Sequence, residues 1–371
     1  MKHISVLIKP ASSLCNLRCQ YCFYANVSSL REVQSYGKMK HEVAEKMIEQ
    51  IFVDLNDGDH VTLAFQGGEP TLAGLSYFRH FVELVQAQNK QVHVHYVIQT
   101  NGMMINERWC QFLKEHQFLV GLSIDGHPLY HDLNRLDARG RGTFQRVLQT
   151  KKLFDQYGIE YNVLCVLTHS LAKEAKRVFQ FIKEQKIRYV QFIPCLDDLD
   201  AKTPNSHGLT PKGFADFYHQ ILQFWLAELA TGNYISIKLF DDLMNLLVHQ
   251  QVTACGILGN CQVQYVIEAD GSVYPCDFYV LDNYRLGYIQ DQSLRELFEQ
   301  DLSHLFVCEK PPLPAECQTC PFVKMCQGGC KRMRDAVYVD SNGFCGYQQL
   351  LKEFLPNIER IIQYVQKGQR V

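Results

Sequence analysis

Residues 15–24 read CNLRCQYCFY and place three cysteines, Cys15, Cys19 and Cys22, within eight residues. A structural metal site normally has four protein ligands, whereas a disulfide needs two thiols. Short loops rich in cysteine suit iron–sulfur clusters, because neighbouring residues can reach neighbouring irons. The spacing C-x3-C-x2-C therefore predicts a 4Fe–4S cluster bound at three corners, with the fourth iron open. A zinc knuckle completed by His41 or a distant cysteine is the alternative.

This loop follows the first of a regular series of strand and helix patterns. Before residue 210 the sequence alternates about six times between short apolar runs and stretches with helical spacing. Such units predict a parallel sheet, and their regularity favours an α/β fold with an open or partial (β/α)6 barrel over a doubly wound sheet. Chemistry in such barrels gathers at the C-terminal strand ends. Those ends carry the cysteine loop and the segments QGGEP (66–70), QTNG (99–102), SIDG (123–126) and PCLDD (194–198).

After the sixth unit the alternation stops and the chain becomes rich in cysteine. Two helical patterns come first, followed by a hairpin with an Asp-Gly turn at 270–271. One closing helix is expected over residues 346–366. We therefore expect a barrel domain over residues 1–230 and a cysteine-rich domain with a C-terminal helix over residues 231–371.

Eight of the fifteen cysteines lie in this last third, and eight thiolates divide into two sets of four. Four thiolates fully ligate one 4Fe–4S cluster, so two closed clusters are expected. Two zinc sites of four thiolates each are the alternative. The four scattered cysteines, Cys110, Cys165, Cys195 and Cys308, are expected to be buried as small hydrophobic residues.

Composition excludes several classes of protein. A formal net charge of −2 gives no reason to expect a nucleic acid as a partner. The apolar run at the N-terminus is much shorter than a signal-peptide core, and no stretch approaches the ~20 apolar residues that span a bilayer. Cysteines at ordered spacings are typical of metal ligands in a reducing compartment, so we expect a cytoplasmic protein without a membrane partner.

With aromatic residues on both sides of its third cysteine, CNLRCQYCFY resembles the signature loop of the radical S-adenosylmethionine superfamily. The resemblance implies that S-adenosylmethionine binds the open iron and is cleaved to a 5′-deoxyadenosyl radical. QGGEP resembles the strand end that holds the methionine part of this cofactor, with Gly68 allowing close approach and Glu69 accepting from the ammonium. The other implied contacts with this cofactor are Tyr21, Ser123, Asp125, Arg135 and Leu196. For Arg135 the alternative is a surface ion pair with Asp132 or Asp137.

The cysteine-rich region resembles the SPASM extension of radical enzymes that modify peptides. This resemblance implies two auxiliary 4Fe–4S clusters, which makes three clusters in all. The first would be held by Cys255, Cys261, Cys276 and Cys330, and the second by Cys317, Cys320, Cys326 and Cys345. This division into two sets comes from the resemblance, because spacing alone groups Cys330 with Cys317, Cys320 and Cys326, which lie just before it in the sequence.

Segments along nearly the whole chain, among them AFQGGEPTLAGL and YPCDFYVLD, resemble anaerobic sulfatase-maturating enzymes. The resemblance implies oxidation of a cysteine, in some members also a serine, to Cα-formylglycine in a C/S-x-P-x-R-like segment of an unfolded sulfatase. It implies Asp277 as the base, an auxiliary cluster as electron acceptor, and substrate contacts from Gln66 and Tyr24. For Asp277 the alternative is a carboxylate that caps a turn. A flavodoxin or ferredoxin would supply electrons.

Three other functions remain open from the sequence. Another SPASM peptide maturase would form thioether or carbon–carbon crosslinks in a ribosomal peptide. Such enzymes often carry an N-terminal peptide-binding domain, for which the 14 residues before Cys15 leave no room. A multi-cluster electron-transfer protein would not bind S-adenosylmethionine, and it leaves the open iron and QGGEP unexplained. A zinc-based interaction module would be colourless, whereas an iron–sulfur protein is brown.

Overall fold

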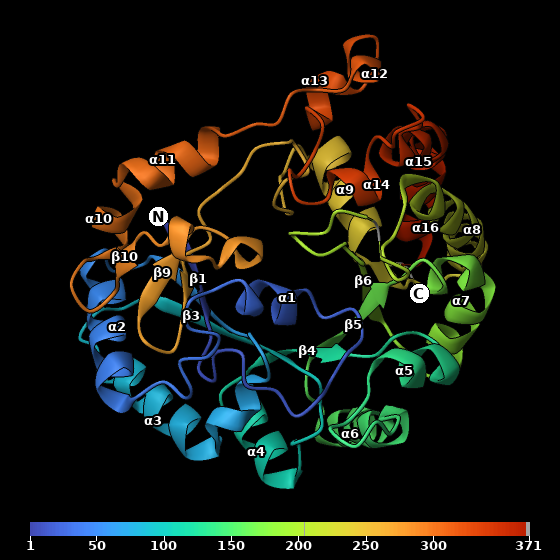
Figure 1. The fold of residues 1–371 in the computed structure, drawn as a ribbon. Helices are drawn as coiled ribbons and strands as arrows, with labels where there is room; N and C mark the ends of the chain where they lie inside the picture. The colour runs from blue at the N-terminus through green and yellow to red at the C-terminus, as the bar shows by residue number, and fades with distance from the viewer. Residues whose placement is uncertain (204, 369–371) are drawn as a thin grey trace. The chain divides into compact units, whose positions relative to one another are not determined.

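The structure is a computed structural model in which residues 1–203 and 205–368 are described (Figure 1). Contacts divide the chain into two compact units, each built from separate segments. The first unit comprises residues 1–123, 135–161 and 262–309, and the second comprises residues 124–134, 162–261 and 310 onward. Each unit combines residues from before and after position 230, and the domain boundary expected there remains a prediction.

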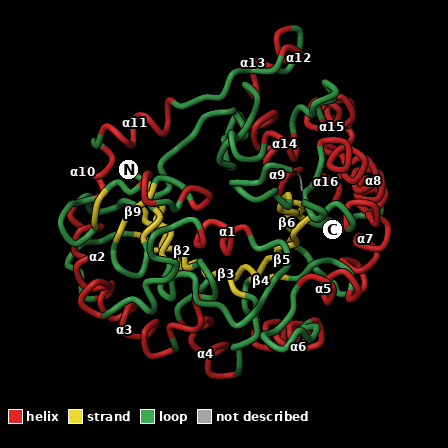
Figure 2. The backbone as a smooth tube through the Cα atoms, in the orientation of Figure 1, coloured by secondary structure: helices red, strands yellow, loops and turns green. Residues whose placement is uncertain are grey.

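Four parallel strands form the central sheet of the first unit. They are β1 (His3–Ile8), β2 (His60–Phe65), β3 (His93–Thr100) and β4 (Leu119–Ser123), paired in that order. The helices α2 (His41–Val53), α3 (Leu75–Gln86) and α4 (Glu107–Glu115) alternate with these strands and lie along one side of them (Figure 2). Phe65 on the buried side of β2 packs against Phe78 and Phe81 of α3, with ring centroids 4.9 Å apart in both pairs. The alternation expected from the sequence is confirmed.

The predicted hairpin extends this same sheet. β8 (Val266–Ile267) and β9 (Ser272–Tyr274) pair antiparallel, and the left-handed turn residue Gly271 has φ of 88°. β8 also pairs in parallel with β1, and β10 (Gly287–Tyr288) pairs with β9. The hairpin therefore lies beside the last two residues of β1, Leu7 and Ile8. The unit also contains α1 (Phe23–Ser29), α6 (Phe144–Tyr157), α10 (Leu294–Phe298) and α11 (Asp301–Cys308).

The second unit holds a smaller parallel group of strands. These are β5 (Tyr161–Leu167), apart from its first residue, β6 (Tyr189–Pro194) and β7 (Ser236–Ile237). The helices that accompany them are α5 (Pro128–Asn134), α7 (Ala175–Glu184), α8 (Pro211–Ala230) and α9 (Lys238–His249). Trp225 of α8 is fully buried and donates its indole N–H to the carbonyl of Ile235 at 2.7 Å. This bond fixes α8 to the segment that leads into β7.

The C-terminal segment departs from the prediction of one closing helix. It forms α15 (Gly346–Phe354) and α16 (Ile358–Gly368), separated by a 3-10 turn at Leu355–Asn357 that contains Pro356. The prediction was wrong because proline lacks an N–H and its ring clashes with the preceding turn of a helix. α15 packs beside α8, which fixes its first turn within the unit.

Short helices fill the cysteine-rich region. They are α12 (Ala315–Gln318), α13 (Val323–Cys326) and α14 (Arg334–Val337). Such one-turn elements hold several loops close together without a strand, as the sequence pattern indicated. None of the described helices has the length and apolar character required to cross a bilayer.

Candidate active site

The cysteine loop connects β1 with α1 in the first unit. Cys15 accepts hydrogen bonds at its sulfur from the backbone N–H of Leu17 at 3.4 Å and from the side-chain amide of Asn101 at 3.8 Å. Burial raises the pKa of the Cys15 thiol to about 11, whereas Cys22 is exposed. Amide donors aimed at a sulfur are the environment that an iron-bound thiolate needs, so the loop fits a cluster.

The QGGEP loop packs directly on the cysteine loop. The N–H of Gly68 donates to the carbonyl of Ser12 at 2.9 Å, and the N–H of Glu69 donates to the carbonyl of Leu14 at 2.8 Å. A Cβ atom on Gly68 would lie 2.1 Å from the Leu14 carbonyl oxygen, well inside van der Waals contact. Gly68 is therefore required by the approach of the two loops, which is a reason separate from any contact with a cofactor.

We expect Gly68→Ala to reduce the iron bound by the cysteine loop, because the added methyl group must displace the backbone next to Cys15. Iron content of protein reconstituted under anaerobic conditions measures this. Gly213→Ala is the matched control: Gly213 lies in the first turn of α8, and its Cβ would come no closer than 3.3 Å to any atom. An iron content in Gly68→Ala equal to that of the control would contradict the prediction.

Glu69 is bonded by four donors of the protein itself. Its carboxylate accepts from the N–H groups of Asn101 at 2.8 Å and Thr71 at 3.1 Å, and from the hydroxyls of Thr71 at 2.5 Å and Thr100 at 2.7 Å. Burial raises the pKa of this carboxyl, and the four hydrogen bonds oppose that rise. The structure gives Glu69 the role of tying the QGGEP loop to the end of β3. Three of these donors bond Oε1 and one bonds Oε2, so Oε2 keeps a lone pair for a further donor, and the contact with a cofactor ammonium stays a prediction.

Asp277 lies three residues after β9 and next to the end of β1. Its Oδ1 is 2.6 Å from Nζ of Lys9, and its Oδ2 accepts from the amide of Gln66 at 2.7 Å. Lys9 is fully buried and Asp277 is 8% exposed. Both oxygens are thus held in place, and each keeps a lone pair for a further donor. An oriented carboxylate adjacent in sequence to Cys276 can accept a proton.

Lys9 was missed from the sequence, although the strand pattern contained a signal for it. Val6 and Ile8 are buried on the helix-facing side of β1, so Lys9 falls on the opposite side, with Leu7. A lysine on that side at a strand end needs an anion when it is buried. Gln66 donates its side-chain N–H to Asp277 in this structure, and its predicted contact with the substrate stays a prediction.

Tyr24 forms the other side of the Lys9 site. Nζ of Lys9 lies 3.6 Å from the centroid of the Tyr24 ring, and the Tyr24 hydroxyl donates to Glu268. Burial raises the pKa of the Tyr24 phenol well above its ordinary value. Its hydroxyl already has a protein partner and its ring is covered by Lys9, so a substrate contact through Tyr24 remains a prediction.

A buried ion pair lies behind Tyr24. Nη1 of Arg31 is 2.7 Å from Oε1 of Glu268, and both side chains are fully buried. Arg31 follows α1, and Glu268 follows β8, so the pair connects the cysteine-loop segment to the hairpin that carries Asp277. Sequence reasoning missed this pair, because 237 positions separate its members.

The remaining predicted cofactor contacts are divided between the two units. In the first unit Ser123 ends β4, and the buried guanidinium of Arg135 lies 5.6 Å from the centroid of the Tyr21 ring. Asp137 forms its ion pair with Arg141 at 2.7 Å. In the second unit Asp125 accepts from the N–H of Val166 at 3.0 Å, and Leu196 is buried. These contacts stay predictions.

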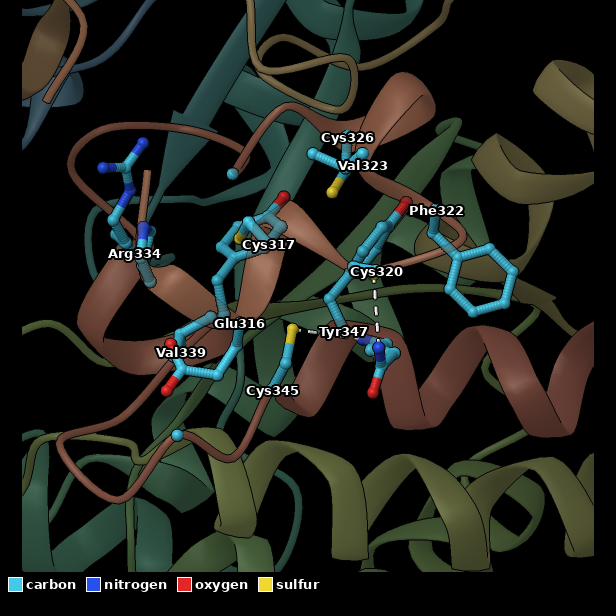
Figure 3. A pocket seen from close by; sticks show the side chains of 15 residues that line it. Glu316, Cys317, Cys320, Phe322, Val323, Cys326, Arg334, Val339, Cys345 and Tyr347 are labelled. Atoms are coloured by element: carbon cyan, nitrogen blue, oxygen red, sulfur yellow. Dashed lines mark hydrogen bonds between the residues drawn. The ribbon is translucent and has the colours of Figure 1, made fainter. Parts of the chain in front are cut away.

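Four cysteines of the second unit line one pocket (Figure 3): Cys317, Cys320, Cys326 and Cys345. Cys317 lies in α12, Cys320 between α12 and α13, Cys326 at the end of α13, and Cys345 is the N-cap of α15. Burial, together with the charges of Cys326, Cys317 and Cys320, raises the pKa of Cys345 to about 11, and the hydrogen bond from the backbone N–H of Gln348 opposes that rise. The set is the one that the SPASM resemblance assigns to the second auxiliary cluster, and Cys330 does not line this pocket.

The number of sulfurs in the pocket fits a 4Fe–4S cluster, which takes one thiolate at each of its four irons. Among the described residues, no three Cys, His, Asp or Glu side chains converge closely enough to bind one metal ion. The ligands of a 4Fe–4S cube bind four different irons, so their sulfurs lie farther apart than the ligands of one ion.

The first auxiliary set is only partly brought together within one unit. Gly256 lies against Cys330, because a Cβ on Gly256 would be 2.8 Å from the Cβ of Cys330. This places Cys255 near Cys330 in the second unit, which also contains Cys261, while Cys276 belongs to the first unit. The assignment of these four cysteines to one cluster stays a prediction.

Three of the four scattered cysteines are buried as expected. Cys110, Cys165 and Cys195 are no more than 2% exposed. The expectation for Cys308 was wrong: it is exposed as the last residue of α11, which turns Ser303 and Phe306 inward instead. Helical position, rather than the apolar character of the thiol, decides its environment.

Comparisons with known proteins give matches over most of the chain. The family model of the radical SAM superfamily matches residues 10–182, and that of an iron–sulfur cluster-binding domain, SPASM, matches residues 255–321. The chain is 44% identical to the cysteine-type anaerobic sulfatase-maturating enzyme of Clostridium perfringens, over 95% of this chain and 96% of that relative. It is 30% identical to the serine-type anaerobic sulfatase-maturating enzyme of Klebsiella aerogenes, over 94% and 85% of the two chains.

A solved structure described as native anSMEcpe with bound AdoMet and Cp18Cys peptide matches with a TM-score of 0.88 and 41% identity. The match covers 98% of this chain and 99% of that chain. The fold class expected from the sequence is confirmed by this agreement and by the two family models.

Proposed function

The chain belongs to the anaerobic sulfatase-maturating enzymes, which are radical S-adenosylmethionine proteins, and on this premise we propose that it oxidises a cysteine of a sulfatase polypeptide to Cα-formylglycine. The higher identity to the cysteine-type relative than to the serine-type relative supports cysteine as the residue modified. Family membership removes the support for a crosslinking maturase, for an electron carrier and for a zinc-based module.

The observation that carries the proposal is the arrangement around Asp277. An oriented carboxylate, held by Lys9 and Gln66, follows Cys276 in sequence and lies in the same unit as the cysteine loop. An enzyme that oxidises a thiol-bearing carbon must remove a hydrogen atom, a proton and an electron from its substrate before hydrolysis. Asp277 offers a base for the proton, and the cysteine sets would hold the clusters that serve the other two tasks.

Three thiolates, Cys15, Cys19 and Cys22, would hold the first cluster, and the auxiliary sets would hold two more. When bound, the first cluster and S-adenosylmethionine supply the radical that takes a hydrogen atom from Cβ, and an auxiliary cluster supplies an electron acceptor. Asp277 takes the thiol proton, and the ammonium of Lys9 keeps its carboxylate oriented toward the substrate. Gln66 fixes the second oxygen, so that proton uptake does not require the carboxylate to rotate.

The substrate is proposed to be an unfolded segment of C-x-P-x-R type, because the related structure binds a peptide rather than a folded protein. A flavodoxin or ferredoxin is the proposed electron donor, since the first cluster needs one low-potential electron per turnover. The cytoplasm is the proposed compartment, because a set of thiolate ligands requires reducing conditions.

The test is anaerobic incubation of reconstituted protein with S-adenosylmethionine, dithionite and a short C-x-P-x-R peptide. Mass spectrometry should show the mass change for exchange of sulfur for oxygen with loss of two hydrogens. A matched S-x-P-x-R peptide distinguishes cysteine-type from dual specificity. Cleavage of S-adenosylmethionine with an unchanged cysteine peptide would overturn the proposal.

A further inference from the structure

Gln348 contacts two of the four cysteines that line the pocket of the second unit. Its backbone N–H donates to the sulfur of Cys345 at 3.4 Å, and its side-chain amide donates to the sulfur of Cys320 at 3.2 Å (Figure 3). The residue lies in the first turn of α15, where Cys345 is the N-cap. One residue therefore directs two N–H groups at two sulfurs of the same set.

Lys352 fixes which end of the Gln348 amide faces the sulfur. Its Nζ donates to Oε1 of Gln348 at 3.1 Å, one turn further along α15. An ammonium can only donate, so the amide oxygen must point toward Lys352 and the NH2 group toward Cys320. The positive end of the α15 helix dipole lies on the same side as the two donors.

We propose that Gln348 raises the reduction potential of the auxiliary cluster held by Cys317, Cys320, Cys326 and Cys345. The inference rests on the proposed assignment of these cysteines to one cluster. Reduction adds negative charge to the cluster, and part of that charge lies on the ligand sulfurs. N–H donors stabilise the reduced form more than the oxidised form, so hydrogen bonds to sulfur raise the potential.

A raised potential matches the chemistry assigned to the auxiliary clusters. Oxidation of the substrate releases one electron in addition to the hydrogen atom, and a cluster accepts that electron more readily when its reduced state is stabilised. Gln348 acts through Cys320 and Cys345 and touches no substrate atom, so it is a positioning residue for this auxiliary cluster.

The test is a potentiometric titration of the holoenzyme followed by electron paramagnetic resonance. In Gln348→Leu, which removes the side-chain donor, the midpoint potential of this cluster should shift to more negative values. In Gln348→Glu the donor becomes an anionic acceptor, and the shift should be larger in the same direction. Lys352→Met should give a smaller shift of the same sign. Gln349→Leu is the matched control, because the Gln349 amide donates to Glu353 at 2.8 Å.

The possible outcomes distinguish a failure of the proposed role of Gln348 from a failure of the assignment of the four cysteines to one cluster. Cys320→Ser with undiminished iron content would overturn the cluster assignment, and with it the inference. Loss of one cluster in Cys320→Ser, together with an unshifted potential in Gln348→Leu, would overturn the inference alone. If Gln348→Leu fails to retain iron, Gln348→Glu decides, since that variant keeps the length of the side chain and the backbone N–H contact to Cys345; an unshifted potential in Gln348→Glu would overturn the inference.

Discussion

Asp277→Asn is expected to abolish most formation of formylglycine while cleavage of S-adenosylmethionine continues. An amide of the same size keeps the shape of the site but cannot accept the thiol proton. Loss of a positioned general base costs about 10²- to 10⁴-fold in rate. Because the cysteine loop is untouched, radical generation should remain, and the ratio of formylglycine to 5′-deoxyadenosine should fall by the full factor.

Asp282→Asn is the control for this measurement. Asp277 begins the 3-10 turn Asp277–Tyr279, and Asp282 begins the next one, Asp282–Tyr284. Asp282 accepts from the exposed N–H of Glu32 at 2.8 Å. It matches Asp277 in residue type and in local structure, and it has no assigned role in the reaction. A formylglycine yield in Asp277→Asn equal to that of the control would remove Asp277 from the role of base.

Asp277→Asn also affects stability, because it leaves the fully buried ammonium of Lys9 without its counter-charge. Removing one member of a buried ion pair typically costs about 3–5 kcal/mol of stability. The double variant Lys9→Met/Asp277→Asn removes both charges. It should recover stability while formylglycine formation stays lost, which separates the chemical effect from the structural one.

The sequence predicted the parts of this site that depend on residue type at a strand end. The cysteine loop and QGGEP are local patterns, and both lie at strand ends as expected. Lys9 and Glu268 were missed because their roles depend on β8 pairing with β1, a pairing between segments far apart in the chain. Local spacing carries no information on which strands become neighbours.

Two other departures have local causes. Pro356 divides the C-terminal helix, although apolar residues at helical spacing continue on both sides of it; the missing N–H outweighs the periodicity. The donors to Glu69 that the structure shows, from Thr71 and from the end of β3, were also not predicted, whereas its ammonium contact stays a prediction. Hydrogen-bond partners of a buried carboxylate are set by packing, which a motif does not describe.

Arg31→Met is expected to cause a large loss of stability in the first unit. It leaves the carboxylate of Glu268 fully buried without its cation, which costs about 3–5 kcal/mol. The Tyr24 hydroxyl would remain as a donor to Glu268, but a neutral donor compensates a buried charge poorly. The midpoint of urea unfolding under anaerobic conditions should fall accordingly.

The exposed ion pair between Lys46 and Glu49 provides the control, and Lys46→Met should leave the midpoint of urea unfolding unchanged.

The double variant Arg31→Met/Glu268→Met tests whether the buried ion pair serves folding or catalysis. Apolar replacements of a buried ion pair are often neutral in stability, so this variant should regain most of what Arg31→Met loses. The pair connects the cysteine-loop segment to the hairpin that carries Asp277. If the double variant is stable but forms less formylglycine per 5′-deoxyadenosine, the ion pair aligns the base. If it forms as much formylglycine per 5′-deoxyadenosine as the wild-type protein, the ion pair serves folding alone.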